Sequence, residues 1–216
     1  MVDFELESKF VILKNPKAVQ GDIMEWLGSS GYSVKKTEHV DQVDVYLDKD
    51  MRIYKSGFSL RQRFINGILH RITLKTLDRL DENGIVRIEE ESKTFPELLK
   101  LVAKKVKSIY QSPVDETVIN LLKNVDLLKP CVIILNHREK CIVTKGENEC
   151  EIAFDTASSL FPVISQPFRE LEIEGSKDFD RIRLYVVEKF GHGRWHAIEK
   201  SETSKFEFGL KAGGLI

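Results

Sequence analysis

The sequence has no apolar run near the roughly 20 residues that a membrane-spanning helix needs, so we expect no membrane partner. The N-terminal segment is acidic from the third residue, which does not fit the pattern of a secretory signal. Only three cysteines occur, and their spacing does not fit a metal site. Free thiols in a reducing compartment are the simpler interpretation. We therefore expect a cytoplasmic protein.

An excess of basic charge is also absent. Lys and Arg number 33 against 34 for Asp and Glu, which gives a formal net charge of −1. Because nucleic-acid-binding proteins usually carry a basic excess, a nucleic-acid partner is not expected. Charged residues nevertheless make up 31% of the chain, above the average of about 25%. The placement of these charges therefore matters more than their sum.

The pattern along the chain predicts strands with helices at a few places. The expected strands are 4–13, 33–47, 58–66, 69–76, 85–91, 132–135, 140–144, 149–155 and 168–174. The expected helices are 15–27, 95–110, 116–122 and 177–190, before a tail that ends in Gly213-Gly214. Asn66-Gly67 predicts a tight hairpin. No repeat or linker divides the 216 residues, so we expect one α+β domain over 1–216, an antiparallel sheet or barrel with flanking helices.

Charged residues alternate with apolar ones along five of the expected strands. Side chains at i and i+2 share one face of a strand. The charged sets are Glu5, Glu7 and Lys9; Arg61 and Arg63; Arg71, Thr73 and Lys75; Arg87, Glu89 and Glu91; and Glu170, Glu172 and Glu174. For any one strand, a solvated face with cross-strand ion pairs is the simpler interpretation. Repetition over five strands favours a shared polar interior.

The two kinds of charge suit one type of ligand. Guanidinium groups bind phosphate in a bidentate manner, and ammonium groups act as compact charges. Carboxylates that face the same space repel one another unless a divalent cation lies between them. Mg²⁺ and Mn²⁺ prefer carboxylates, water and phosphate oxygens. The combination predicts a polyphosphate site with a metal ion.

Several of these motifs resemble those of the CYTH superfamily, the triphosphate tunnel metalloenzymes. Glu5-Leu6-Glu7-Ser8-Lys9 resembles the family's Glu-x-Glu-x-Lys signature, and the likeness continues in family order over nearly the whole chain. The further motifs are Leu60-Arg61-Gln62-Arg63, Thr73-Leu74-Lys75, Arg87-Ile88-Glu89, Arg138-Glu139-Lys140, Asp155, Glu170-Leu171-Glu172 and Ser204-Lys205. The resemblance implies an eight-stranded antiparallel β-barrel that forms a triphosphate tunnel.

The resemblance also implies roles for individual residues. The implied metal ligands and their supporting carboxylates, for Mg²⁺ or Mn²⁺, are Glu5, Glu7, Glu89, Asp155, Glu170 and Glu172. The implied phosphate ligands are Lys9, Arg61, Arg63, Lys75, Arg87, Arg138 and Lys205, with Lys200 as the alternative to the last. Lys9, Arg61, Arg63 and Lys75 are also expected to be catalytic, because they would stabilise the charge that develops on the phosphates.

The predicted function is metal-dependent hydrolysis of a small-molecule triphosphate, with inorganic tripolyphosphate first. Three alternatives stay open: an adenylate cyclase of the same superfamily, a thiamine triphosphatase or RNA 5′-triphosphatase, and a polyphosphate-binding module without catalysis. The retained carboxylates argue against the last of these. No motif that binds adenine or ribose is evident. A homodimer is also considered.

Overall fold

The chain folds into two compact units, each built from segments that are distant in sequence. The computed structural model describes residues 6–76, 79–81, 84–86, 89–109, 116–176, 179–192, 196–201 and 203–216. Unit 1 comprises Met1–Asp41, Asn136–Ser158 and Gln166–Ser204, and unit 2 comprises Gln42–Leu135, Ser159–Ser165 and Lys205–Ile216. This grouping describes how the segments pack together. One domain over residues 1–216 stays a prediction. No helix in the described ranges is long and apolar enough to span a membrane.

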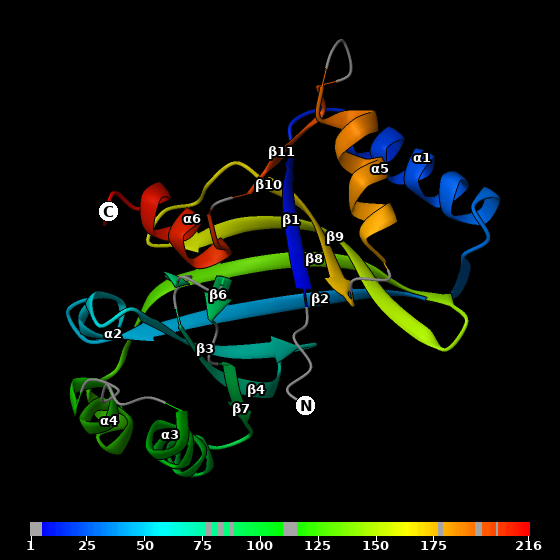
Figure 1. Cartoon of the computed structure of the whole chain (residues 1–216). Helices are drawn as coiled ribbons and strands as arrows, with labels where there is room; N and C mark the ends of the chain where they lie inside the picture. The colour runs from blue at the N-terminus through cyan, green and yellow to red at the C-terminus, as the bar shows by residue number, and fades with distance from the viewer. Residues whose placement is uncertain are drawn as a thin grey trace. The chain divides into compact units, whose positions relative to one another are not determined.

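Strands hold more of the described residues than helices do, and they pair antiparallel (Figure 1). The strands are β1 (Leu6–Ile12), β2 (Ser33–Asp48), β3 (Phe58–Ile65), β4 (Ile68–Thr76), β5 (Arg79–Asp81), β6 (Gly84–Val86), β7 (Glu89–Ser92), β8 (Lys129–Lys145), β9 (Asn148–Phe161), β10 (Phe168–Gly175) and β11 (Ile198–Lys200). Nine of them are hydrogen-bonded in the order β11-β1-β10-β9-β8-β2-β3-β4-β7, and β5 pairs with β6.

The α+β class with antiparallel strands and flanking helices is confirmed, and among the described residues the main sheet has nine strands where the resemblance implied a barrel of eight. Among the described residues the strand order ends at β11 and β7, so the expected closed ladder is not seen there. The strand β11 lies in the C-terminal stretch where the sequence indicated only a tail. Its three residues, Ile198–Lys200, pair with the first strand, which is distant in sequence. A short polar segment gives no sequence signal for such a pairing.

Helices pack on the strands in each unit. They are α1 (Pro16–Ser29), α2 (Arg52–Lys55), α3 (Phe95–Ile109), α4 (Glu116–Lys123), α5 (Asp180–Phe190) and α6 (Lys205–Ala212), with a 3₁₀ turn at Val125–Leu127. In α1, Pro16 occupies the first turn, where its missing N–H costs nothing. The helix ends at Ser29, two residues later than the predicted Leu27. The glycine with positive φ that follows it is Gly31 (φ 79°).

In unit 1, α1 and α5 lie side by side and pack on the apolar face of β1, β8, β9 and β10 (Figure 1). Val19, Ile23 and Leu27 recur every four residues along α1 and are buried. On β10 the apolar residues Leu171 and Ile173 face this core. Because side chains alternate along a strand, Glu170, Glu172 and Glu174 are placed on the opposite face. The helices therefore fix which face carries the acids.

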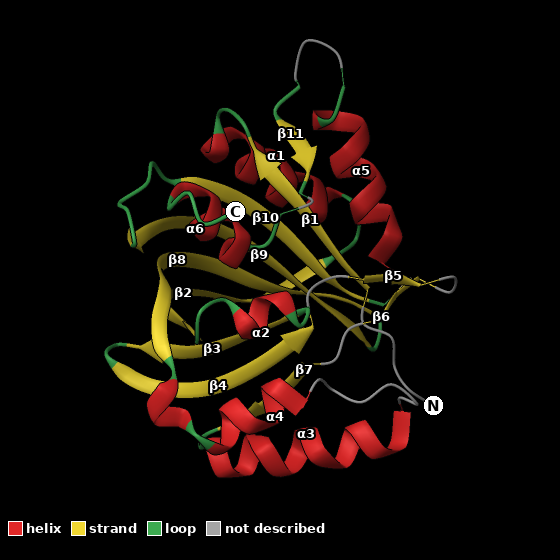
Figure 2. Cartoon of the chain, turned by 90° about the vertical axis from the view of Figure 1, so that its left-hand side faces the viewer, coloured by secondary structure: helices red, strands yellow, loops and turns green. Residues whose placement is uncertain are grey.

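In unit 2, α3 and α4 lie side by side next to β4 and β7 (Figure 2). They cover the apolar residues of β3 and β4, among them Leu60, Ile72 and Leu74, all nearly inaccessible to solvent. The same alternation places Arg61, Arg63 and Lys75 on the other face. At the hairpin between these strands, Asn66 (φ 53°) and Gly67 (φ 77°) both have positive φ, which confirms the predicted tight turn.

The strand β8 corrects the prediction of two separate strands at 132–135 and 140–144. It runs without a break over Lys129–Lys145. The polar stretch Asn136-His137-Arg138-Glu139 looked like a turn in the sequence. In the structure these residues are polar because every second one faces the acidic side of unit 1 rather than because the chain reverses. A polar strand segment and a loop have the same composition.

The helix α6 was not predicted. It packs in unit 2 with Phe206 stacked on Tyr46 at a ring separation of 4.6 Å. A Cβ atom on Gly209 would lie 2.3 Å from Cγ1 of Val132, so only glycine permits this approach. The expected strand at 85–91 falls partly outside the described residues, since 87 and 88 are not among them. Its described parts belong to β6 and β7.

Candidate active site

Three buried carboxylates meet on one face of unit 1. Glu170 of β10 pairs directly with Asp155 of β9, and Glu172 follows two residues later on the same face. Their ligand oxygens all lie within 4.8 Å of one another, and the side chains are buried. We call Asp155, Glu170 and Glu172 the carboxylate cluster. At about 5 Å and an effective dielectric constant of about 20, two like charges repel by about 3 kcal/mol, so the cluster requires cations.

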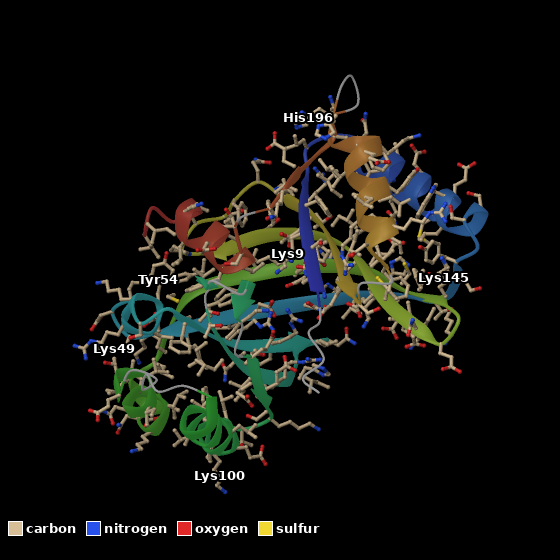
Figure 3. All side chains as sticks on the ribbon, viewed as in Figure 1. Lys9, Lys49, Tyr54, Lys100, Lys145 and His196 are labelled. Carbon is tan, nitrogen blue, oxygen red and sulfur yellow. The ribbon has the colours of Figure 1, made fainter. Side chains whose placement is uncertain are left out.

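Two basic side chains contact the carboxylate cluster. Arg138 of β8 donates from Nε to Asp155 Oδ1 (2.8 Å) and from Nη2 to Asp155 Oδ2 (2.7 Å), and Nη2 also donates to Glu172. Lys9 lies on β1 (Figure 3), with Nζ 3.1 Å from Glu7 Oε1 and 3.8 Å from Glu172 Oε1. Burial alone lowers the pKa of Arg138, but the bonded carboxylates outweigh burial and raise it.

The charges of this set match a divalent cation. Glu7 and the carboxylate cluster supply four acids, and Lys9 and Arg138 supply two bases, which leaves a formal charge of −2 within the set. All the acidic donors are oxygen atoms, the ligand type that the hard cations Mg²⁺ and Mn²⁺ prefer. The carboxylate cluster can therefore bind a metal ion. Such an ion would supply a positive centre that polarises phosphoryl oxygens.

A second charged group lies in unit 2, where two arginines bind one buried aspartate. Arg63 of β3 donates to Asp44 of β2 from Nε and Nη2, each at 2.8 Å, and Arg61 Nη1 lies 3.4 Å from Asp44 Oδ2. Asp44 is inaccessible to solvent. We call Asp44, Arg61 and Arg63 the guanidinium cluster. Burial raises the pKa of Asp44, but the positive charges of Arg61 and Arg63 outweigh it, and the net pKa is lowered.

The remaining predicted basic residues of unit 2 lie on the same strands or near them. Lys75 Nζ is 2.8 Å from Glu89 Oε2 across β4 and β7. Lys205 is buried at the start of α6, and its charge also lowers the pKa of Asp44, which places it close to the guanidinium cluster. Lys200 is exposed on β11. The choice between Lys205 and Lys200 as a phosphate ligand stays a prediction.

Within unit 1 the structure brings several of the predicted metal ligands together. Asp155, Glu170 and Glu172 form the carboxylate cluster, and Lys9 connects Glu7 to it. Glu89 belongs to unit 2, where it binds Lys75. Two further predicted site residues, Glu5 and Arg87, lie outside the described residues. The roles of the individual residues stay predictions.

Sequence reasoning missed Asp44 and Asn136. Asp44 interrupts an apolar alternation, Val43-Asp44-Val45, and one acid in such a strand usually faces water. In the structure it lies directly opposite Arg63, a cross-strand pairing that the pattern within one strand does not reveal. Asn136 is inaccessible to solvent and donates from Nδ2 to Asp155 Oδ1 (3.0 Å). It lies between the two segments that we expected as separate strands, at 132–135 and 140–144.

A sequence model of the CYTH domain matches residues 4–194. The chain belongs to the CYTH domain family. Comparison of this CYTH chain with curated proteins found no match.

Solved structures are similar to the CYTH chain at low identity. An adenylyl cyclase candidate from Hippeastrum, described as having a dominant triphosphatase activity, is 16% identical, with a TM-score of 0.52 over 98% of this chain and 96% of that one. An adenylate cyclase candidate from Bacillus halodurans is 16% identical, with a TM-score of 0.49 over 93% and 94%. A protein from Pyrococcus horikoshii is 22% identical, with a TM-score of 0.46 over 95% and 99%.

Replacing the buried aspartate of the guanidinium cluster should destabilise the protein in a pH-dependent way. Asp44→Asn is expected to lower the free energy of unfolding by about 3–5 kcal/mol, because it leaves Arg61 and Arg63 without their buried counter-charge. The folded pKa of Asp44 is lowered, so its contribution is fully present above the unfolded pKa of about 3.9 and is lost as the pH falls through the folded pKa. Urea unfolding at pH 3 to 7 measures the difference.

Asp50→Asn is the matched control. Asp50 pairs with Lys49 at 2.8 Å on the surface, and 64% of its side chain is exposed. This variant should unfold close to wild type at every pH, since exposed ion pairs contribute little. Equal stability of Asp44→Asn and wild type at pH 7 would contradict the structural role of Asp44.

Proposed function

We propose that this CYTH protein hydrolyses triphosphate compounds with a divalent cation, and that inorganic tripolyphosphate is its best substrate. The observation that carries the proposal is the carboxylate cluster with Arg138 and Lys9 beside it. Acids that can hold Mg²⁺ or Mn²⁺ thus lie within hydrogen-bonding reach of cations that can bind phosphate oxygens. The dominant triphosphatase activity described for the Hippeastrum protein, which shares the fold, supports this choice over the cyclase.

The residues of unit 1 have separate tasks in this proposal. The carboxylate cluster binds the cation. Arg138 offers a planar guanidinium to phosphate oxygens, and Lys9 offers a compact ammonium, so both stabilise negative charge that develops during phosphoryl transfer. The predicted phosphate contacts of Arg61, Arg63, Lys75 and Lys205 stay a prediction, as do the cytoplasmic location and the homodimer.

A substrate panel tests the proposal. We expect kcat/KM for tripolyphosphate to exceed that for ATP by about ten-fold, equal to about 1.4 kcal/mol. No group that binds a nucleoside is evident, so no contact offsets the cost of desolvating the nucleoside of ATP. Pyrophosphate should be cleaved poorly, since it fills fewer phosphate contacts. Phosphate release is measured at one pH with Mg²⁺ and with Mn²⁺, with tripolyphosphate, ATP, thiamine triphosphate and pyrophosphate.

The same samples separate hydrolase from cyclase. Cyclic AMP is measured alongside phosphate. A higher kcat/KM for ATP, with cyclic AMP and pyrophosphate as products, would replace the hydrolase with the cyclase. Binding of tripolyphosphate without turnover would favour the non-catalytic module.

A further inference from the structure

Asn136 occupies a position that no catalytic or binding role explains so far. It lies on β8, two residues before Arg138 and on the same face, and its side chain is inaccessible to solvent. Nδ2 lies 3.0 Å from Asp155 Oδ1. Because an ionised carboxylate only accepts hydrogen bonds, the NH₂ end of the amide must face Asp155. The orientation of the amide is thus fixed by chemistry.

Asp155 is held by two donors of different kinds. Arg138 binds both of its oxygens, and Asn136 binds Oδ1. Arg138 has other partners, since it also donates to Glu172 and lies 3.6 Å from Glu151. In the proposed function it must also contact phosphate. An arginine with so many partners cannot by itself hold Asp155 in one orientation through the whole reaction.

We propose that Asn136 is a positioning residue for the metal-binding carboxylates. It keeps Asp155 oriented toward Glu170 and Glu172, whether or not Arg138 is bound to Asp155. The inference rests on the proposed function, because it assumes that the carboxylate cluster binds the cation. A neutral amide suits this task, since it donates to a carboxylate without adding a charge that would compete with the metal for it.

The other end of the amide supports a role at a ligand site. Oδ1 of Asn136 is buried and accepts no hydrogen bond from any described residue. Buried polar atoms are nearly always paired, so an unpaired carbonyl oxygen needs an explanation. Among the described residues the side chain is therefore explained by the bond at its NH₂ end, while its Oδ1 has no partner.

Binding of Mn²⁺ to the substrate-free protein, measured by isothermal titration calorimetry, tests the inference. Asn136→Ala should weaken Mn²⁺ binding about 10- to 100-fold, the usual effect of removing a residue that orients a metal ligand. Asn136→Leu, of similar volume and without polar atoms, should behave like Asn136→Ala and guards against loss of packing.

Thr144→Val is the matched control. Thr144 is buried on the same strand, and its Oγ1 donates to the carbonyl oxygen of Ser33 at 3.3 Å. It lies eight residues from Asn136, about 27 Å along an extended strand. Urea unfolding should show a loss of stability comparable to that of Asn136→Ala, while Mn²⁺ binding stays as in wild type. A purely structural role for Asn136 would make the two variants alike in both measurements.

The outcomes separate this inference from the proposed function. Wild-type affinity in Asn136→Ala or Asn136→Leu would overturn the inference alone. Failure of the wild-type protein to bind Mn²⁺ would overturn the proposed function together with the inference. Weaker binding by Asn136→Ala and Asn136→Leu, with an unchanged Thr144→Val, supports it.

Discussion

Glu172→Gln is expected to reduce kcat/KM for tripolyphosphate by at least about a hundred-fold. Replacing a residue that only orients a metal ligand typically lowers metal affinity or activity about 10- to 100-fold. Replacing a member of the carboxylate cluster itself should therefore lower activity further. Glu172 is 8% exposed and also contacts Arg138 and Lys9. Replacing Glu172 removes an oxygen that is proposed to bind the metal ion. It also leaves each of the side chains of Arg138 and Lys9 with one carboxylate partner fewer. Steady-state kinetics with Mg²⁺ and with Mn²⁺ measure the effect.

Chelation tests the same dependence on metal without a mutation. Excess EDTA should abolish turnover, and added Mg²⁺ or Mn²⁺ should restore it. Metal plus substrate should also raise the melting temperature by mass action in the wild-type protein and much less in Glu172→Gln.

The matched control for Glu172→Gln is Glu149→Gln. Glu149 lies on β9 in the same unit, 57% exposed and paired with Lys35 at 2.7 Å, and its replacement should leave the kinetics near wild type. Full activity of the wild-type protein in EDTA would exclude metal-dependent hydrolysis.

The face on which the acids of β10 lie could be predicted from the sequence, because alternation with Leu171 and Ile173 leaves only one arrangement for Glu170 and Glu172. Their partners could not. The register that sets Glu170 opposite Asp155 depends on pairing between β9 and β10, and alternation within one strand does not determine which residues meet across two. Asp155 was found through the family resemblance alone.

Polar residues inside strands account for much of what was missed. Asn136 and Arg138 made the middle of β8 look like a turn, although they are polar because they bind Asp155. Asp44 looked like a solvated residue, although two arginines neutralise it in a buried position. In each case the hydrogen-bonding partner lies 17 or more residues away in the sequence. Local patterns cannot distinguish a buried charge with a partner from an exposed one.

Arg138→Gln is expected to change metal binding and substrate binding in opposite directions. Arg138 donates to Asp155 and Glu172, two members of the carboxylate cluster that a divalent cation would also use. Removing the guanidinium leaves the carboxylates without its positive charge, so they repel one another more strongly, by about 3 kcal/mol for a pair near 5 Å. A divalent cation that binds between them relieves this repulsion and therefore binds more tightly. We therefore expect tighter Mn²⁺ binding by the substrate-free variant, by about ten-fold, and a lower melting temperature without metal.

Substrate handling should worsen in the same variant. Losing a charge-assisted contact to phosphate costs roughly 1.5–3 kcal/mol, so kcat/KM for tripolyphosphate should fall about 10- to 100-fold at saturating Mn²⁺. Lys140→Gln is the matched control, because Lys140 lies two residues along the same face of β8 but binds Glu151 (3.1 Å) and Glu38 (3.5 Å), neither of which belongs to the carboxylate cluster. It should change neither quantity. If Arg138→Gln weakened Mn²⁺ binding, Arg138 would be organising the carboxylates rather than competing with the cation for them, and the kinetic loss would then follow from the metal site and not from the phosphate.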